Sequence, residues 1–152
     1  MKTVHVTWLQ KQQYVGVDSS KHSVVLSTQD ADNGIGMKPA ELLLVALGGC
    51  TSVDVVSILE KKRQPLTGLE VEVSGEQDSD PPHAFRKIHV TYRVRGRGLK
   101  ARAVEQAVTL SEEKYCSVGA TLRAAATITH SIELIDEASD TVSAAEIAVP
   151  EE

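Results

Sequence analysis

The sequence predicts an α+β protein. Three short segments with strand character come first, with no helix between them. A long apolar helical pattern follows, then two alternating segments, two shorter helical patterns and a last alternating segment. Because strands and helices come in separate runs, this order indicates the α+β class and not a regular alternation of the two.

Apolar and polar residues alternate at the start of the chain, where Val4, Val6 and Trp8 predict a half-buried strand. Two more short strands are expected near 14–18 and 23–28, and a polar, glycine-containing loop over 29–37 ends the third. With no helix between them, the three strands predict an antiparallel sheet.

A long helix is predicted over 38–63. Pro39 suits the first helical position, because a proline lacks only an N–H that has no partner there. Glu41 in the first turn complements the helix dipole, and Pro65 stops the helix after a basic last turn. The half over 42–47 is apolar on all sides, which predicts burial on every side.

The remaining elements follow the same patterns. They are strands over 69–74, 87–95 and 127–135, a helix over 99–113 and a short helix over 118–126. Basic residues on the outer face of the long strand are interpreted as a solvated face, with an anion- or acid-docking patch as the alternative: Lys87, Arg93, Arg95 and Arg97. A single domain is predicted over 1–135, with an acidic, flexible tail over 136–152.

Composition narrows the classes of function. The 152 residues carry a net charge of -5, with 16 basic against 21 acidic residues, which argues against nucleic-acid binding. We expect no apolar run that approaches the roughly 20 residues of a membrane-spanning helix. The N-terminal residues lack the apolar core of a signal peptide. We therefore expect a cytoplasmic protein that does not bind a membrane.

The two cysteines, Cys50 and Cys116, are the first candidates for chemistry. In a reducing compartment such a pair is catalytic, redox-active or simply buried. Cys50 follows two glycines inside the long helix, and the alternative is a small core side chain. Cys116 lies near a predicted helix N-terminus with Lys114 before it, and both features favour a thiolate. The alternative for Cys116 is a buried thiol at a helix junction.

The sequence indicates no metal or cofactor site. No two of the five histidines have a metal-ligand spacing, and His130 is interpreted as a core histidine with a satisfied partner. Two thiols exclude a four-cysteine zinc site within one chain. A zinc site formed by Cys50, Cys116 and a histidine is a weaker alternative. The chain also has no phosphate-binding loop, no Ser-His-Asp order and no dinucleotide fingerprint.

Two segments resemble a known family. The segment Lys38-Pro39-Ala40-Glu41-Leu42-Leu43-Leu44-Val45-Ala46-Leu47-Gly48-Gly49-Cys50 is similar to the first-cysteine helix of the OsmC/Ohr family, the osmotically induced and organic-hydroperoxide-resistance proteins. The segment Ser111-Glu112-Glu113-Lys114-Tyr115-Cys116-Ser117-Val118 is similar to its second-cysteine segment. The forms Gly-Gly-Cys and Lys-Tyr-Cys-Ser-Val look most like the YhfA-type branch.

The resemblance implies an intertwined homodimer in which antiparallel sheets wrap around long central helices. It also implies a thiol peroxidase for organic hydroperoxides, active in oxidative stress defence. Cys50 would be the peroxidatic cysteine, Cys116 the resolving cysteine and Glu41 the candidate catalytic carboxylate. A dithiol, a lipoylated protein in characterised members, would reduce the disulfide. A redox sensor or small-ligand-binding protein on the same fold is the alternative.

Two positions differ from the family pattern. Family peroxidases place an arginine in the loop before the first-cysteine helix, whereas this chain has no arginine before Arg63. The family carboxylate usually follows the proline directly, where this chain has Ala40, and Glu41 comes one residue later. One residue is about 100° of helix, so the direction of the Glu41 side chain differs from the family's.

Overall fold

The computed structural model describes residues 1–137. Contacts divide the chain into two compact units, Met1–Leu43 and Leu44–Glu152, with the boundary inside the first helix. The expected single domain over 1–135 stays a prediction. Of the predicted tail over 136–152, Asp136 is the last residue of a strand and pairs with Gly96, and the Glu137 amide donates to the Gly96 carbonyl. Residues 138–152 lie outside the described residues.

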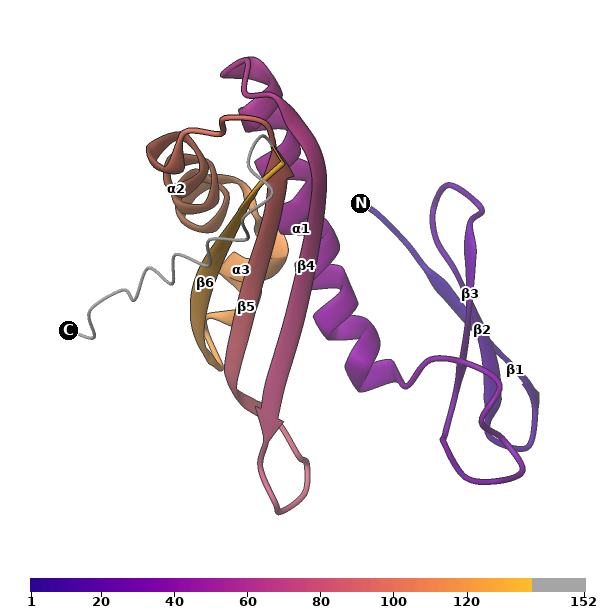
Figure 1. Ribbon diagram of the computed structural model, residues 1–152. Helices are drawn as coiled ribbons and strands as arrows, with labels where there is room; N and C mark the ends of the chain where they lie inside the picture. Colours follow the sequence, from indigo (N-terminus) through magenta and orange to yellow (C-terminus); the bar gives the residue numbers. More distant parts are fainter. Residues whose placement is uncertain (138–152) are drawn as a thin grey trace. The chain divides into compact units, whose positions relative to one another are not determined.

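The first unit contains the predicted antiparallel sheet. Its strands β1 (His5–Gln10), β2 (Gln13–Val17) and β3 (Ser23–Ser27) pair in the order β1-β2-β3 (Figure 1). However, β1 is exposed on both faces, with Val6 and Trp8 exposed by 61% and 64%. The prediction of a half-buried first strand is therefore wrong for one chain by itself.

The second unit contains a mixed sheet in the order β4-β5-β6 (Figure 1). Strand β4 (Leu66–Gln77) pairs antiparallel with β5 (Phe85–Gly96), but β5 pairs in parallel with β6 (Thr127–Asp136). The prediction of antiparallel sheets is wrong for this last pair. The reason is the long crossover between β5 and β6, which carries helices and returns the chain to the start of the sheet.

Helices cover one face of the second sheet (Figure 1). They are α1 (Pro39–Lys61), of which the part from Leu44 belongs to this unit, α2 (Ala101–Leu110) and α3 (Ser117–Leu122). A one-turn π-helix, η1 (Ser111–Tyr115), splits the region predicted as helix over 99–113. The core between helices and sheet contains Leu47, Val55, Leu59, Ile88, Val90, Tyr92, Val94, Val104, Ala107, Val108, Cys116, Ala126 and Ile132.

Gly48 explains how closely α1 packs on the sheet. A Cβ at this position would lie 3.1 Å from Cγ2 of Val73 on β4, which is tighter than ordinary van der Waals contact. The glycine thus permits a close approach of the helix to a strand side chain, and α1 continues through it without a break. At Gly49, by contrast, a Cβ would meet nothing within 4 Å.

The α1 helix is more apolar and more exposed than expected. It has 23 residues and a mean hydropathy of 2.1 in its most apolar stretch, enough in length and composition to cross a membrane, so the estimate that no segment approaches this length was wrong. One side of the helix, including Leu47, Val55 and Leu59, is buried in the core. Leu43 and Val45 are exposed by 40% and 52%, so the predicted burial of 42–47 on every side is wrong for a single chain. Val53, further along the helix, is exposed by 71%.

The basic outer face of β5 is neutralised by carboxylates on the neighbouring strands. The Arg93 guanidinium contacts Glu70 at 3.2 Å, Glu72 at 2.9 Å and Glu133 at 3.0 Å. These carboxylates raise the pKa of Arg93, and the hydrogen bond that Arg93 donates to Glu72 is the largest cause. The pairing supports the interpretation as a solvated face over that of a docking patch.

Candidate active site

The structure brings the two cysteines together. Cys50 lies in the middle of α1 and is partly exposed, whereas Cys116 lies between η1 and α3 and is only 3% exposed. Both are free thiols. Burial raises the pKa of Cys116 to about 11, and a hydrogen bond and charge from Cys50 act in the same direction. A partly exposed thiol thus packs against the core that contains the buried one and lies close enough to shift its pKa.

The backbone holds Cys116 at the first residue before α3. Its conformation is extended, with φ -71 and ψ 97, and its Sγ accepts a hydrogen bond from the Gly119 amide at 3.2 Å. This bond lowers the pKa of Cys116, as expected near a helix N-terminus, but burial outweighs it. Lys114 is not among the groups that shift the pKa of Cys116, and its Nζ lies over the Tyr115 ring, 5.6 Å from the ring centre. The expectation that Cys116 favours the thiolate was therefore wrong.

A buried chain of hydroxyl groups passes through Thr51, the residue that follows Cys50 in α1. The Thr51 hydroxyl lies 2.7 Å from the Tyr92 hydroxyl and 2.9 Å from the Ser111 hydroxyl. The Ser111 hydroxyl donates to Oδ2 of Asp54 at 2.9 Å. Thr51, Tyr92 and Ser111 are at most 1% exposed. We call the three hydroxyls and the Asp54 carboxylate the hydroxyl chain.

Three ionisable side chains near Cys116, those of Glu112, Arg123 and His130, interact with one another. Nη1 of Arg123 donates to the Glu112 carbonyl at 2.6 Å, and Nδ1 of His130 lies 3.0 Å from the Glu112 carboxylate. The His130 ring meets the Tyr92 ring edge-on, with the ring centres 6.2 Å apart. The interpretation of His130 as a histidine with a satisfied partner is supported.

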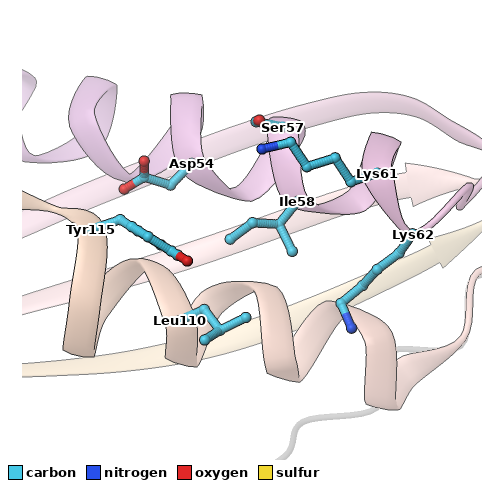
Figure 2. A pocket seen from close by; sticks show the side chains of 7 residues that line it. All are labelled: Asp54, Ser57, Ile58, Lys61, Lys62, Leu110 and Tyr115. Atoms are coloured by element: carbon cyan, nitrogen blue, oxygen red, sulfur yellow. The ribbon is translucent and has the colours of Figure 1, made fainter.

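Two cavities flank the hydroxyl chain. A small one of about 10 Å³, which is about the space of one water molecule, is lined by Leu47, Thr51, Val90, Tyr92, Glu112, Cys116, Gly119, Arg123 and Ile128. A larger, open pocket of about 340 Å³ is lined by Asp54, Ser57, Ile58, Lys61, Lys62, Leu110 and Tyr115. Figure 2 shows α1 on one side of this pocket and Leu110 and Tyr115 on the other. Asp54 thus borders the open pocket, whereas Thr51 and Tyr92 border the enclosed cavity.

The predicted carboxylate, Glu41, belongs to the first unit. It forms an ion pair with Lys38 at 3.2 Å, and both side chains are about half exposed, at 56% and 49%. A role for Glu41 beside Cys50 stays a prediction. Within residues 1–137, no group of three or more His, Cys, Asp or Glu side chains is placed to hold a metal ion.

Sequence reasoning missed the hydroxyl chain and Arg123. One usable signal was available for Tyr92, since it lies on the apolar face of a strand and a buried phenol needs a hydrogen-bond partner. Thr51 and Ser111 are 60 residues apart, and nothing in the sequence connects them. Arg123 follows the second cysteine, whereas the family pattern directs attention to the loop before the first.

This fold, with a cysteine in a central helix beside a second cysteine before a short helix, agrees with the comparison with known families. The model of the OsmC-like protein family matches residues 29–131, and the chain belongs to this family. Protein YhfA of Escherichia coli K12 is 40% identical over 130 residues, which are 86% of this chain and 96% of YhfA.

Solved structures agree in fold. A hypothetical protein from Aquifex aeolicus VF5 is 29% identical with a TM-score of 0.76, over 88% of this chain and 97% of the other. An OsmC-like protein from Mycoplasma pneumoniae has a TM-score of 0.77 at 14% identity, over 88% and 96%. The organic hydroperoxide resistance protein OhrB of Bacillus subtilis has a TM-score of 0.60 at 14% identity, over 88% and 98%.

Proposed function

We propose that this protein is a two-cysteine thiol peroxidase that reduces organic hydroperoxides in oxidative stress defence. The observation that carries the proposal is the closeness of the partly exposed Cys50 to the buried Cys116. Membership of the OsmC-like family supports it, as does the name of OhrB, the structural relative linked to organic hydroperoxide resistance.

The chemistry assigns a separate step to each thiol. The Cys50 thiolate attacks the outer oxygen of the hydroperoxide, the O–O bond breaks, and the alkoxide leaves and is protonated to an alcohol. Cys50 becomes a sulfenic acid, the first step of thiol oxidation. Cys116 then attacks the Cys50 sulfur, forming a disulfide and releasing water. An external dithiol, for which a lipoylated protein is the family precedent, restores both thiols.

Arg123 is the cation that we assign to this site. It lines the cavity beside Cys116, and its guanidinium is anchored by the Glu112 carbonyl at 2.6 Å. A guanidinium held in this way stabilises developing negative charge on sulfur or oxygen. Arg123 would take the place of the family arginine that this chain lacks before the first-cysteine helix. Glu41, which pairs with Lys38, stays a candidate for the catalytic carboxylate.

The proposed assembly is a homodimer in the cytoplasm. Exposed apolar side chains on β1 and α1, such as Trp8, Val45 and Val53, would be covered by a second copy of the chain. A reducing compartment supplies the dithiol that completes the cycle. Neither a nucleic acid nor a membrane is part of the proposed function.

The experiment is mass spectrometry after one equivalent of cumene hydroperoxide. The wild-type protein is expected to form the Cys50–Cys116 disulfide. Cys116→Ser stops at the Cys50 sulfenic acid, and Cys50→Ser shows no turnover. If both cysteines stay reduced in the wild-type protein while dithiothreitol is oxidised normally, the peroxidase proposal is wrong.

A second candidate, a small-ligand-binding protein, is favoured by the open pocket of about 340 Å³ beside Asp54. Its apolar walls of Ile58 and Leu110 and its two lysines, Lys61 and Lys62, suit a small amphipathic anion. Binding of a medium-chain fatty acid, measured by calorimetry with the reduced protein, tests this candidate. Lack of binding would exclude it, whereas binding without disulfide formation would favour it over the peroxidase.

A further inference from the structure

The protons of the hydroxyl chain have one direction. The single proton of the Ser111 hydroxyl is donated to Asp54 at 2.9 Å, so the Ser111 oxygen must accept from Thr51. The Thr51 oxygen has then used its own proton and accepts from Tyr92 at 2.7 Å. All three hydroxyl protons therefore point toward Asp54, and the Tyr92 oxygen keeps a lone pair as an acceptor.

The chain also connects two different environments. At one end, Tyr92 and Thr51 line the small cavity that Cys116 also lines. At the other end, Asp54 lines the open pocket (Figure 2). Ser111 connects Thr51 at the first end with Asp54 at the second. All polar side-chain atoms buried within residues 1–137 have a hydrogen-bond partner.

Cys116 needs such a connection. Its side chain is 3% exposed, so neither hydroxide nor buffer bases reach the thiol directly. Yet the resolving step requires that the thiol lose its proton, because the thiolate is the nucleophile. We propose that the hydroxyl chain is a proton path that carries the Cys116 proton to Asp54 as the disulfide with Cys50 forms, an inference that rests on the proposed function.

The step balances as follows in atoms and charge. The Cys116 proton crosses the cavity of about 10 Å³ that Cys116 and Tyr92 both line and reaches the Tyr92 oxygen. Tyr92 passes its own proton to Thr51, and the exchange continues until the Asp54 carboxylate is protonated. The Cys116 thiolate attacks the sulfur of the Cys50 sulfenic acid, the S–S bond forms and the S–O bond breaks. The hydroxide that leaves takes up one proton, and Asp54 releases one to water, so thiol and sulfenic acid give disulfide and water.

Charges from every neighbouring element act on this path. The titratable and charged groups that border the two cavities or contact their residues are Cys50, Asp54, Lys61 and Lys62 of α1, Tyr92 of β5, Glu112 and Tyr115 of η1, Cys116, Arg123 and His130 of β6. Burial is the largest cause of the raised pKa of Cys116, and the negative charge of Asp54 is one of the smaller causes that raise it further. Removing that charge alone therefore increases the thiolate fraction of Cys116.

The proton path and a purely electrostatic role of Asp54 thus predict opposite signs. Asp54→Asn keeps an oxygen that accepts from Ser111 but removes both the charge and the proton acceptor. If Asp54 acts only by its charge, Cys116 attacks faster in this variant. If the path operates, the attack slows by about a hundredfold or more, which is the usual scale of general base catalysis.

The test measures the lifetime of the Cys50 sulfenic acid, trapped with dimedone after a single addition of cumene hydroperoxide, from pH 6 to 9. Asp54→Asn and Ser111→Ala are both expected to prolong it, and both should reduce the solvent deuterium isotope effect of the resolving step. Glu60→Gln removes an equal charge from an exposed position of the same helix and is the matched control. Thermal unfolding shows whether each variant is folded.

A second assay separates this inference from the proposed function. In the Cys50→Ser background, the reaction of Cys116 with a small disulfide, dimethyl disulfide, needs no peroxide. The path predicts slower exchange with Asp54→Asn than without it. An unchanged or faster rate in this assay overturns the proton path even where the wild-type protein reduces peroxide, and slower exchange supports the path even where it does not.

Discussion

The Cys116 sulfur accepts a hydrogen bond from the Gly119 amide at 3.2 Å, and both residues line a cavity of about 10 Å³. The amide stabilises the thiolate, while burial stabilises the thiol. Since burial is the larger of the two causes, the pKa of Cys116 is raised to about 11. Cys116 thus combines the position of a helix cap with the properties of a core side chain.

The raised pKa makes folding stability depend on pH. Below pH 9.0, the ordinary value for a thiol, Cys116 is protonated in both states and its contribution is fully present. Between there and the folded value of about 11, the unfolded chain loses the proton and the folded one keeps it, so the contribution is lost as pH rises. The urea midpoint of reduced wild-type protein is expected to fall more from pH 8 to pH 10.5 than that of Cys116→Ser. An equal fall in both would contradict this.

The hydroxyl chain predicts unequal costs for two substitutions. Tyr92→Phe removes one end of the chain and leaves Thr51 bonded to Ser111, so we expect a loss of about 1 kcal/mol in unfolding free energy. Thr51→Val removes the middle and leaves the buried Tyr92 hydroxyl without this partner, which costs about 1–3 kcal/mol. Urea unfolding measures both, and a larger loss for Tyr92→Phe would contradict the arrangement.

Gly48 and Gly49 are neighbours in α1 that differ in the space around them, so alanine substitutions at the two positions can be compared directly. Alanine favours a helix over glycine by about 1 kcal/mol, and a Cβ at Gly49 meets nothing within 4 Å. Gly49→Ala is therefore expected to raise the free energy of unfolding by about that amount. At Gly48 the Cβ would lie 3.1 Å from Val73, so Gly48→Ala gains less or is destabilising. The reverse order in urea unfolding would show that the packing of α1 on β4 is looser than described.

Exposed valines on α1 provide the test of assembly. Val53 is 71% exposed, and a lysine there would place a charge in any interface that covers this side of the helix. We expect wild-type protein to be a dimer by light scattering at micromolar concentration and Val53→Lys to shift toward the monomer. The exposed substitution Glu60→Gln is the control. A wild-type monomer would contradict the proposed homodimer.

Much of the fold could be predicted from local patterns. Alternation located each strand, and Pro39 and Pro65 marked the limits of α1 to within a few residues. The parallel pairing of β6 with β5 could not be predicted, because alternation shows which face of a strand is buried and not the direction of its neighbour. Burial of 42–47 was overestimated because an apolar pattern does not say whether the same chain supplies the cover.

Only those site residues could be predicted whose residue type is rare in this sequence. Cysteines are few, so Cys50 and Cys116 could be singled out without knowing that they lie close together. Threonine and serine are common, and Thr51 becomes informative only when the fold brings Ser111 to within 2.9 Å. The ionisation of Cys116 was predicted in the wrong direction, because proximity to a helix N-terminus is visible in the sequence and depth of burial is not.

The parallel pairing of β5 and β6 has a consequence for access to the resolving cysteine. Residues 97–126, which include Cys116, form a segment whose two ends are held by adjacent strands. The segment contributes Val104, Ala107 and Val108 to the core, and the Ser111 hydroxyl bonds it to Asp54 of α1 at 2.9 Å. Lifting the crossover would expose this core, so a protein-sized reductant would attack the disulfide from the side of the partly exposed Cys50.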